Sequence, residues 1–310
     1  MKVLIVANFN MGHFSPFVVE QVNSIRKLGV EFEYFGVVGK GPLGYLRNLP
    51  ALKRMIKEFR PDIVHAHYGL SGLFATLQKK IPAIVTYHGS DIHKGGLILF
   101  LSRIAMYKAV WNIIVSNPLC KIANIKRNVS VIPCGADEKM FVPMNKEVVR
   151  AKLGWGKSEK VVAFAGAFDR EVKNPQLAKD AIHVISDARI LELKGYSRKE
   201  VNFIFNAVDC LLMTSHNEGS PQVIKEAMLC GTPIVSVDVG DVKDVCGLTE
   251  GTYICKATPQ DIAASLNKAF TFGKRTDGRK RIIQLGLTNE LVAKKILAIY
   301  TNILDNLRIK

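Results

Sequence analysis

The chain has 310 residues, of which 48% are hydrophobic and 23% charged, which suggests a folded protein of about two domains and argues against a disordered chain. No apolar run reaches the roughly 18 residues of a membrane-spanning helix, and the six cysteines show no paired spacing, so we expect a cytoplasmic protein with reduced thiols. The formal net charge of +16 is unusual and raises the question of an anionic partner.

Residues 1–145 alternate short apolar segments with longer periodic ones. Strands are expected at residues 2–7, 31–37, 62–65, 83–87, 112–116 and 130–133, with helices between them such as 14–28, 70–80 and 97–110. This alternation predicts a parallel sheet covered by helices on both faces. The loop after the first strand contains Gly12 but lacks the glycine pattern of a dinucleotide-binding turn, which argues against a nicotinamide cofactor. No cofactor is expected.

Most of the positive charge lies in this first half, which has 18 Lys and Arg against 8 Asp and Glu. The densest part is residues 40–60, where six cations are interleaved with apolar side chains. Such a segment favours the surface of an anionic membrane, and the alternative is a solvated helix face whose other side lies in the core. Nucleic acid is not expected as a partner, because no nucleic-acid-binding motif is present.

Histidines follow or occupy two of the predicted strands. His88-Gly89-Ser90-Asp91 comes directly after the fourth strand, which makes His88 a candidate functional residue. We interpret His65 and His67 as facing opposite sides of their strand, in core or supporting roles, so that they cannot readily share a metal ion. No other metal-ligand spacing is present, and no metal site is expected.

The pattern of strands restarts in the second half. Strands are expected at residues 160–165, 189–193, 210–213, 233–237 and 253–255, and residues 143–157 are interpreted as a linker with a short helix. We therefore predict domains at residues 1–145 and 146–288. Residues 289–310 contain a long amphipathic helix that could pack across either domain, including back onto the first.

One segment of the second half places two glutamates around the start of a helix. Ser220 suits the N-cap and Pro221 the first helical position, so Glu218 lies at the mouth of the helix and Glu226 about two turns along it. The unpaired amides and the dipole of the first turn favour an anion such as a phosphate. Carboxylates accept hydrogen bonds from hydroxyls, so a nucleotide sugar would match this layout. The alternative is a surface helix in which Glu218 only complements the helix dipole and Glu226 is solvated.

At these residues the chain resembles family 4 retaining glycosyltransferases. The run from Glu218-Gly219-Ser220-Pro221 through Glu226-Ala227-Met228 to Gly231-Thr232-Pro233 is similar to the two-glutamate signature of that family. Its other landmarks are matched in order by the residues at 62–67, 88–91 and 131–137, followed by Phe141. Four landmarks in register with strand ends span nearly the whole chain. The resemblance implies a GT-B architecture, an α/β fold with two Rossmann-like domains whose parallel sheets face across a cleft.

The resemblance also implies roles for individual residues. Glu218 would hold the donor sugar, Glu226 the ribose of the nucleotide, Lys173 the diphosphate, and His88 would approach the reacting sugar, so that His88, Glu218 and Lys173 are the implied catalytic residues. Other residues implied to line the donor site are Gly12, Arg170, Gly195, Tyr196, Gly219, Ser220 and Pro221. His13 and Asp91 are expected on the acceptor side, in the first domain. No covalent protein nucleophile is implied.

The chain departs from the family pattern in two places. Ala167 stands where the family usually has an arginine. Arg170, three residues later, has two interpretations: it supplies the missing charge, or it is a loop arginine exposed to water. Between Lys173 and Cys210 there is room for fewer strand and helix units than usual, in the region where the base is normally bound.

The function that the resemblance implies is transfer of a sugar, with retention and without a metal ion, from a nucleotide-sugar donor, preferably UDP-linked. The acceptor would be a glycan or a lipid-linked molecule, as in bacterial surface polysaccharide synthesis, and the enzyme could be peripheral on the inner face of the membrane. The alternatives are another GT-B enzyme, such as a nucleotide-sugar epimerase, and a non-catalytic protein that binds nucleotide sugars or glycans.

Overall fold

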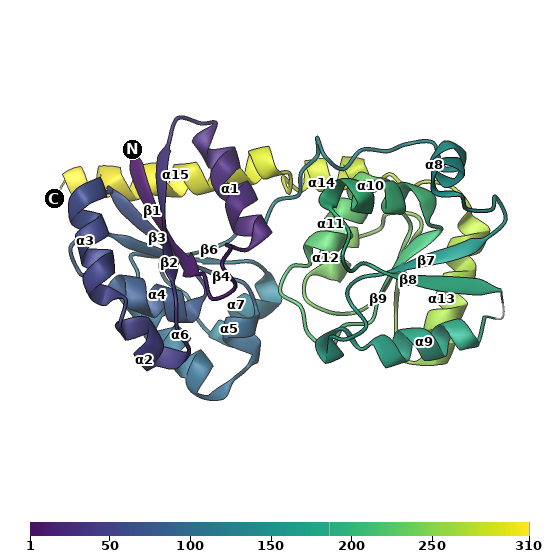
Figure 1. The fold of residues 1–310 in the computed structure, drawn as a ribbon, viewed down its shortest axis with the longest axis horizontal. Helices are drawn as coiled ribbons and strands as arrows, with labels where there is room; N and C mark the ends of the chain where they lie inside the picture. The colour runs from purple at the N-terminus through teal and green to yellow at the C-terminus, as the bar shows by residue number, and fades with distance from the viewer. Residues whose placement is uncertain (186, 310) are drawn as a thin grey trace. The chain divides into compact units, whose positions relative to one another are not determined.

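The computed structural model describes residues 1–185 and 187–309 and divides into two compact units (Figure 1). Unit 1 contains Met1–Gly135 together with the C-terminal segment that begins at Asn289, and unit 2 is Ala136–Thr288. Lys310, the last residue of the predicted terminal segment, lies outside the described residues.

The division falls after Gly135, whereas the predicted boundary was near residue 145. Two asparagines of unit 2 account for the difference. Val142 N donates to Asn202 Oδ1 at 3.3 Å, and Met144 N donates to Asn206 Oδ1 at 2.6 Å. These bonds tie residues 136–145 to unit 2, although the segment has no regular structure of its own.

Unit 1 is built around a six-stranded parallel sheet in the order β2-β1-β3-β4-β5-β6. Its strands are β1 (Lys2–Asn8), β2 (Glu31–Val37), β3 (Ile63–His67), β4 (Ala83–Tyr87), β5 (Trp111–Ile114) and β6 (Val129–Val131). β3 and β4 are buried at every position. β4 is a largely apolar run, as expected for a buried parallel strand, whereas β3 also buries His65 and His67.

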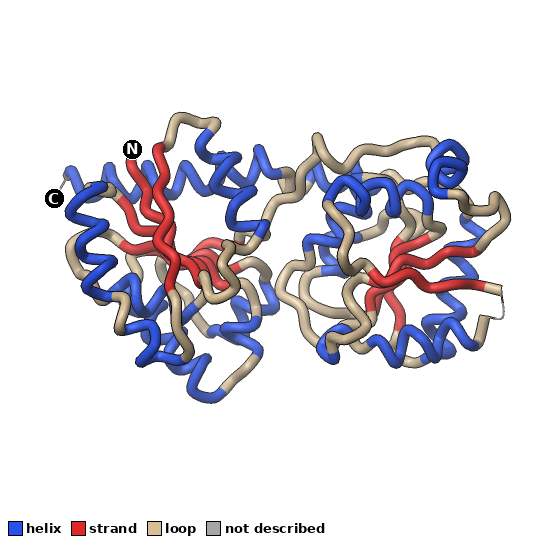
Figure 2. Tube along the Cα trace, viewed as in Figure 1, coloured by secondary structure: helices blue, strands red, loops and turns tan. Residues whose placement is uncertain are grey.

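Helices cover both faces of this sheet (Figure 2). They are α1 (Pro16–Arg26), α2 (Gly41–Leu46), α3 (Leu49–Phe59), α4 (Gly69–Thr76), α5 (Ser90–His93), α6 (Gly96–Lys108), α7 (Asn117–Ala123) and α15 (Asn289–Arg308). One core cluster joins the sheet to α3, α4, α6 and α7, and a second joins the opposite face to α1 and α15. The amphipathic C-terminal helix therefore packs on unit 1, where it buries Val292, Ile296 and Tyr300.

Unit 2 contains a five-stranded parallel sheet in the order β11-β10-β9-β7-β8. Its strands are β7 (Lys160–Phe164), β8 (Ala188–Glu192), β9 (Cys210–Met213), β10 (Ile234–Val237) and β11 (Thr252–Cys255). Its helices are α8 (Lys146–Leu153), the short 3-10 helix η1 (Glu171–Lys173), α9 (Pro175–His183), α10 (Arg198–Ala207), α11 (Gln222–Leu229), α12 (Val242–Cys246), α13 (Pro259–Phe272) and α14 (Gly278–Gln284). α9 and α13 pack on each other, as do α11 and α14.

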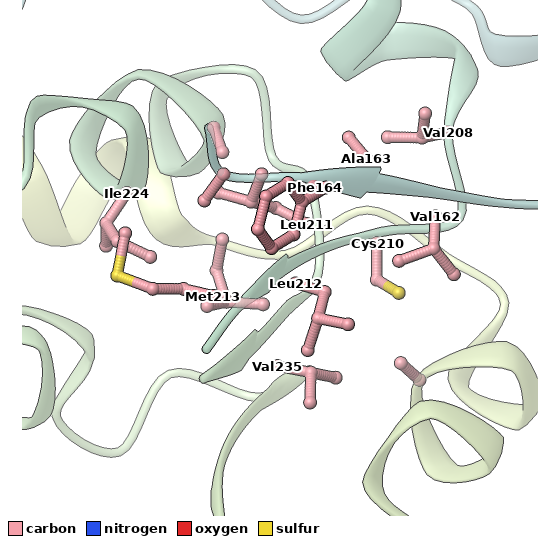
Figure 3. Close-up of a cluster of buried hydrophobic side chains, with 14 of the residues drawn as sticks. Val162, Ala163, Phe164, Val208, Cys210, Leu211, Leu212, Met213, Ile224 and Val235 are labelled. Atoms are coloured by element: carbon pink, nitrogen blue, oxygen red, sulfur yellow. The ribbon is translucent and has the colours of Figure 1, made fainter. Parts of the chain in front are cut away.

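The core of unit 2 is centred on β7 and β9 (Figure 3). Phe164, Leu211 and Leu212 are fully buried there, and Ile224 of α11 packs against the same cluster. Burying side chains of this size stabilises the fold by about 1.5–3 kcal/mol each. The packing also fixes where β7 and β9 end and α11 begins, which are the positions that matter for the candidate site.

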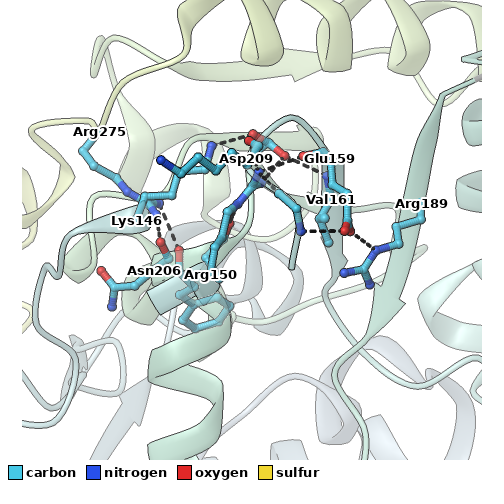
Figure 4. A network of polar contacts seen from close by, with 12 residues as sticks. Lys146, Arg150, Glu159, Val161, Arg189, Asn206, Asp209 and Arg275 are labelled. Carbon is cyan, nitrogen blue, oxygen red and sulfur yellow. Dashed lines mark hydrogen bonds and ion pairs between the residues drawn. The ribbon is translucent and has the colours of Figure 1, made fainter. Parts of the chain in front are cut away.

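A buried arginine joins the other ends of these strands (Figure 4). Arg150 of α8 is 2% exposed, and its guanidinium donates to the backbone carbonyls of Ala207 and Glu159 and to Asp209 Oδ2 at 2.8 Å. Asp209 also accepts from Lys146 Nζ at 2.5 Å. This network closes the side of unit 2 away from the candidate site.

The predicted fold class is confirmed, because each of the eleven predicted strands is present and both sheets are parallel. Among the described residues no helix is both long enough and apolar enough to cross a membrane.

Candidate active site

In unit 2 the predicted donor residues gather at the carboxyl ends of β7 and β9. These two strands are neighbours, and the chain runs outward from them in opposite directions, to β8 on one side and to β10 and β11 on the other. A reversal of this kind leaves a crevice at the strand ends, where open parallel sheets bind ligands. The loop after β7 carries Lys173, and the loop after β9 carries Glu218.

Lys173 and Glu218 form an ion pair at this edge, with 2.5 Å between Nζ and Oε1. Both side chains are mostly buried, at 19% and 15% exposure. The position of Lys173 is set by the end of β9, because Thr214 Oγ1 donates to the carbonyls of Lys173 and Asn174 at 2.9 Å. The pair puts a cation and a carboxylate side by side, so each can turn toward a different part of one ligand.

Two glycines allow the loops to come this close. A Cβ on Gly166 would lie 2.8 Å from the side chain of Lys173, and a Cβ on Gly240 would lie 2.9 Å from the carbonyl oxygen of Gly219. Both distances are too short for a side chain, and Gly240 has a positive φ of 58°. The loops after β7, β9 and β10 therefore interlock around the Lys173–Glu218 pair.

The start of α11 differs in detail from the prediction. The N-cap is Pro221 rather than Ser220, and the helix begins at Gln222 without a side-chain cap from the described residues. Ser220 Oγ instead donates to Asp241 Oδ2 at 2.5 Å. Burial raises the pKa of Asp241, and Lys225 opposes this rise. An anion at the first-turn amides of α11 therefore meets no competition from a capping side chain in the described part of the chain.

Glu226 lies within α11, farther along the helix than this start, and is 5% exposed. Its Oε1 accepts a hydrogen bond from Arg198 Nη1 at 2.9 Å, and the guanidinium of Arg198 stacks over Phe141 at 4.9 Å. Burial raises the pKa of Glu226, and the charge of Arg198 opposes this rise. The alternative in which Glu226 is solvated is therefore wrong, because its carboxylate is buried and paired with Arg198.

The remaining predicted donor residues of unit 2 are in exposed loops. Gly195, with a φ of 80°, and Tyr196, at 41% exposure, follow β8, while Arg170 precedes η1. Phe168 N donates to Glu192 Oε2 at 2.6 Å, which holds the loop after β7 against the end of β8. Arg170 is thus on the rim of the site, whereas Lys173 is inside it.

Unit 1 has a corresponding reversal between β1 and β3, and a pocket of about 380 Å³ lies at their carboxyl ends. His13 and Asp91, both predicted on the acceptor side, line this pocket. Gly12 lies in the same exposed turn as His13 and has a φ of 73°. The other lining residues are Asn8, Met11, Ser15, Tyr45, Tyr68, Leu70, Ser90, Lys94 and Ile98.

Asp91 organises the loop beside this pocket. Its carboxylate is 4% exposed and accepts from the backbone amides of Gly89 at 2.8 Å, Gly69 at 3.1 Å and His88 at 3.2 Å. Burial raises its pKa, and these amide hydrogen bonds oppose the rise. Asp91 therefore fixes the backbone that presents His88.

His88 is held by two neighbours within unit 1. Its Nε2 is 3.0 Å from His67 Nδ1, and its Nδ1 is 3.6 Å from Cys134 Sγ. His67 Nε2 is buried without a hydrogen-bond partner among the described residues. Burying an unpaired acceptor nitrogen costs less free energy than burying an unpaired N–H donor. We therefore assign the ring proton of His67 to Nδ1. His88 then accepts at Nε2 and donates from Nδ1. A hydrogen bond from His88 to a ligand would replace one of these two contacts.

The prediction that His65 and His67 face opposite sides of their strand is wrong. Residues two apart share a face, and the two rings stack with centroids 4.7 Å apart. Both are fully buried, and His65 Nδ1 is 2.5 Å from the hydroxyl oxygen of Tyr300 in α15. Among the described residues, no group of three or more His, Cys, Asp or Glu side chains is arranged to hold a metal ion.

Arg198, Asp241 and His67 were not among the predicted site residues. Arg198 could have been found, because the capping box of Ser197 and Glu200 marks a helix start just after β8, and residues that follow strands have priority. Asp241 and His67 also stand at strand ends, after β10 and at the end of β3, but their roles depend on contacts with Ser220 and His88, which are distant in sequence.

Two family profiles match this chain. "Glycosyltransferase Family 4" matches residues 12–139, and "Glycosyl transferases group 1" matches residues 189–284. The teichuronic acid biosynthesis glycosyltransferase TuaC of Bacillus subtilis is 25% identical over 244 residues, which are 68% of this chain and 62% of TuaC. D-inositol 3-phosphate glycosyltransferase of Mycobacterium marinum is 26% identical over 58% of this chain and 49% of its own length. The chain thus aligns with about half to three fifths of these relatives.

Solved structures are similar over nearly the whole chain. Sucrose-phosphate synthase of Thermosynechococcus elongatus matches with a TM-score of 0.83 and 17% identity, covering 98% of this chain and 99% of that one. Anabaena HepE in complex with UDP matches with a TM-score of 0.78 and 14% identity, covering 97% and 100%. These likenesses concern the fold.

The two parallel-sheet units and these structural neighbours define a protein of the GT-B class. Within that class, the chain belongs to glycosyltransferase family 4, the group 1 glycosyl transferases.

Proposed function

We propose that this protein transfers a sugar, with retention of configuration, from a UDP-sugar to a glycan or lipid-linked acceptor. The observation that carries the proposal is the paired arrangement in unit 2, where Lys173 contacts Glu218 at 2.5 Å and Arg198 contacts Glu226 at 2.9 Å at the end of the same sheet. An ammonium, a helix start and two carboxylates are the groups that a diphosphate flanked by two hydroxyl-bearing rings requires.

The donor would lie along the start of α11. Its diphosphate would be bound by Lys173 and by the backbone amides of Gly219 and Ser220, and its transferred sugar would donate hydroxyl hydrogen bonds to Glu218. Glu226 would accept from the ribose hydroxyls, with Arg198 holding the carboxylate in place. The names of the structural neighbours support the choice of base, because HepE was solved with UDP, with UDP and glucose and with UDP-glucose.

In the reaction, the bond between the anomeric carbon and the diphosphate oxygen breaks, and negative charge develops on the diphosphate. Lys173 is positioned to stabilise that charge, which is how preorganised cations lower the barrier to transfer. The acceptor hydroxyl would attack the anomeric carbon from the side that the diphosphate leaves, which preserves the configuration, and its proton would pass to the departing diphosphate. The proposal assigns no covalent bond to the protein.

The relatives support an acceptor of a cell-surface polysaccharide pathway. TuaC is named for teichuronic acid biosynthesis, and WaaB, a structural neighbour with a TM-score of 0.73, is named a lipopolysaccharide outer core galactosyltransferase. We propose that the pocket at the ends of β1 and β3 in unit 1 takes the acceptor, with His13 on its rim.

The proposal is tested by turnover with a panel of UDP-, ADP-, GDP- and dTDP-sugars, in the presence and absence of EDTA. We expect slow release of UDP from a UDP-sugar without acceptor, faster release with the correct acceptor, and product of retained configuration by NMR. Conversion of the UDP-sugar into an epimer without release of UDP would favour the epimerase alternative. Binding without any turnover, across the acceptors tried, would favour the non-catalytic alternative.

A further inference from the structure

Helix α6 presents large apolar side chains to solvent on one side. Leu97 is 64% exposed, Phe100 is 60% exposed and Tyr107 is 91% exposed. The three lie at positions i, i+3 and i+10, within roughly a quarter of the helix circumference. Ser102, Ala105 and Met106 of the same helix are buried against the rest of unit 1. α6 thus has one face in the core and a second apolar face without cover from the described residues of its unit.

Cations surround this second face. Arg103 and Lys108 are exposed on the same helix, and Lys94 is exposed just before it. We call Leu97, Phe100, Arg103, Tyr107 and Lys108 the α6 face.

The sequence around the α6 face has no acidic residues. Residues 92–136 contain six Lys and Arg and no Asp or Glu. A groove of about 720 Å³ runs from α6 to the segment after α7, lined by Arg103 and Tyr107 and by Lys126 and Arg127. Both ends of the helix therefore lie in positive surroundings.

The α6 face differs in this respect from α3, in the basic segment that the sequence singles out. In α3 Leu52 is 0% exposed and Ile56 is 7% exposed, and both belong to the core cluster that joins the sheet to α3, α4, α6 and α7. The cations Lys53, Arg54 and Lys57 of α3 lie on its outer side with no large exposed apolar side chain between them. α3 therefore matches the alternative of a solvated basic face, while α6 combines charge with exposed apolar surface.

We infer that the α6 face docks this protein on an anionic lipid bilayer. Aromatic and leucine side chains that enter the boundary between headgroups and acyl chains, with Lys and Arg at the level of the headgroups, are the arrangement by which helices lie on such surfaces. A bilayer with anionic lipids also complements the stretch of residues 92–136, which carries positive charge alone. A protein partner would need acidic groups for each of these cations, and a second copy of this chain carries a formal net charge of +16, which opposes association.

The docking surface adjoins the pocket of unit 1. Lys94 and Ile98, at the start of α6, line that pocket. A lipid-linked acceptor would therefore enter the pocket from the bilayer. This last step rests on the proposed function, whereas the docking itself does not.

The test measures co-sedimentation with vesicles of phosphatidylcholine alone and of phosphatidylcholine mixed with phosphatidylglycerol, without any donor. The wild type should sediment with the anionic vesicles and should remain in solution when only neutral vesicles are present. The triple variant L97S/F100S/Y107S should bind at least about tenfold more weakly. The matched control V184S/L248S/I283S changes three exposed apolar residues of unit 2 and should bind like the wild type.

A second readout locates the contact. In the variant Phe100→Trp the fluorescence of the new indole, taken as the difference from wild type, should shift to shorter wavelength when anionic vesicles are added. Neutralising Arg103, Lys108 and Arg127 together should weaken binding more than neutralising Lys53, Arg54 and Lys57 of α3.

Three outcomes would overturn the inference. The first is failure of the wild type to bind anionic vesicles, and the second is equal binding by L97S/F100S/Y107S. The third is a blue-shifted indole in the Phe100→Trp variant without lipid, together with a dimer in solution, because a second copy of the chain would then cover the α6 face. These outcomes leave the donor reaction of unit 2 untouched.

Discussion

Lys173 and Glu218 form an ion pair of 2.5 Å at the carboxyl ends of β7 and β9, although 45 residues separate them in the sequence. The family resemblance gives the two side chains separate duties, with the lysine on the diphosphate and the glutamate on the sugar. Their contact in the protein keeps both oriented and compensates their charges. A donor that binds here would replace this one ion pair by two interactions, one of Lys173 with the diphosphate and one of Glu218 with the sugar. The free-energy cost of breaking the pair in this way is lower than that of burying either charged group without a partner.

Replacing Lys173 by Met should lower turnover more than donor binding. Loss of one preorganised group that stabilises developing charge costs roughly 100-fold in kcat or more. Steady-state kinetics with the UDP-sugar should show this fall with a much smaller change in KM. Lys179→Met is the matched control, since Lys179 is an exposed lysine of α9 that stacks on Phe168. Equal effects of the two variants would show that Lys173 has no special role.

Replacing the two glutamates of the site one at a time should affect different quantities, nucleotide binding for Glu226 and turnover for Glu218. Glu226→Ala removes the proposed ribose contact and should weaken UDP binding roughly tenfold or more, as expected for a hydrogen bond to a charged group. Glu218→Ala should leave UDP binding nearly unchanged, lower turnover and relax the choice of sugar. Calorimetry with UDP and kinetics with several UDP-sugars measure the two effects. Small and equal effects in both variants would contradict the assigned roles.

Arg198→Met should destabilise unit 2 through Glu226. The substitution leaves a carboxylate that is 5% exposed without its ion-pair partner, and we expect a loss of about 1–3 kcal/mol in the free energy of unfolding. Urea unfolding measures it, and adding Glu226→Gln should recover part of the loss. The control is Arg189→Met, because the pair of Arg189 with Glu159 is solvent-exposed and should contribute less to stability.

Arg150→Met should destabilise the protein more strongly. Arg150 is 2% exposed, and its guanidinium donates to Asp209 and to several backbone carbonyls, so its removal leaves buried acceptors unpaired at a cost of about 3–5 kcal/mol. Lys146 contacts the same Asp209 but is 30% exposed, and Lys146→Met should cost about 1 kcal/mol or less. A urea titration in which both variants unfold at the same midpoint would contradict the structural role given to Arg150.

Stability should fall in mild acid because of the buried histidines. Burial lowers the pKa of His67 from 6.5 to about 3, and it lowers the pKa values of His65 and His88 well below 6.5. The unfolded chain takes up these protons near pH 6.5 and the folded chain does not, so the free energy of unfolding decreases as the pH falls below 6.5. Between pH 6.5 and 5, His67 alone should account for about 2 kcal/mol.

Buried carboxyls act in the opposite sense. Burial raises the pKa values of Asp91 and Glu226, so the folded state takes up their protons first and gains stability as the pH falls. Comparison of wild type with His67→Gln isolates the histidine, because the carboxyls are common to both. The variant should lose less stability than wild type between pH 7 and 5 in urea unfolding. The exposed-residue control His183→Gln should behave like wild type.

The sequence predicts the framework of this protein well and its side-chain partners less well. All eleven strands are predicted because buried parallel strands such as β9 and β10 consist largely of apolar residues, and this signal is local. Lys173 is implied by the family resemblance, whereas the strand-end rule finds His88 and the strand-turn-helix pattern finds Glu218. These are the positions at which a local pattern and the topology of a parallel sheet coincide.

The contacts between these residues depend on tertiary packing. Nothing near Glu226 in the sequence indicates Arg198, and the role of Ser220 changes from helix cap to hydrogen-bond donor because Asp241 comes within 2.5 Å of it. The boundary between the units falls after Gly135 for a similar reason, since Asn202 and Asn206 bind the segment that follows it. Partners of this kind are determined by loops that meet only in the folded chain.

The central claim is that unit 2 binds the nucleotide of a sugar donor through Glu226. The most direct measurement is a calorimetric titration of UDP into the wild type and into Glu226→Ala, with Lys179→Met as a control. We expect one site in the wild type, binding at least about tenfold weaker in Glu226→Ala, and wild-type affinity in the control. If the folded wild type binds neither UDP nor any other nucleotide of the donor panel, the claim is wrong.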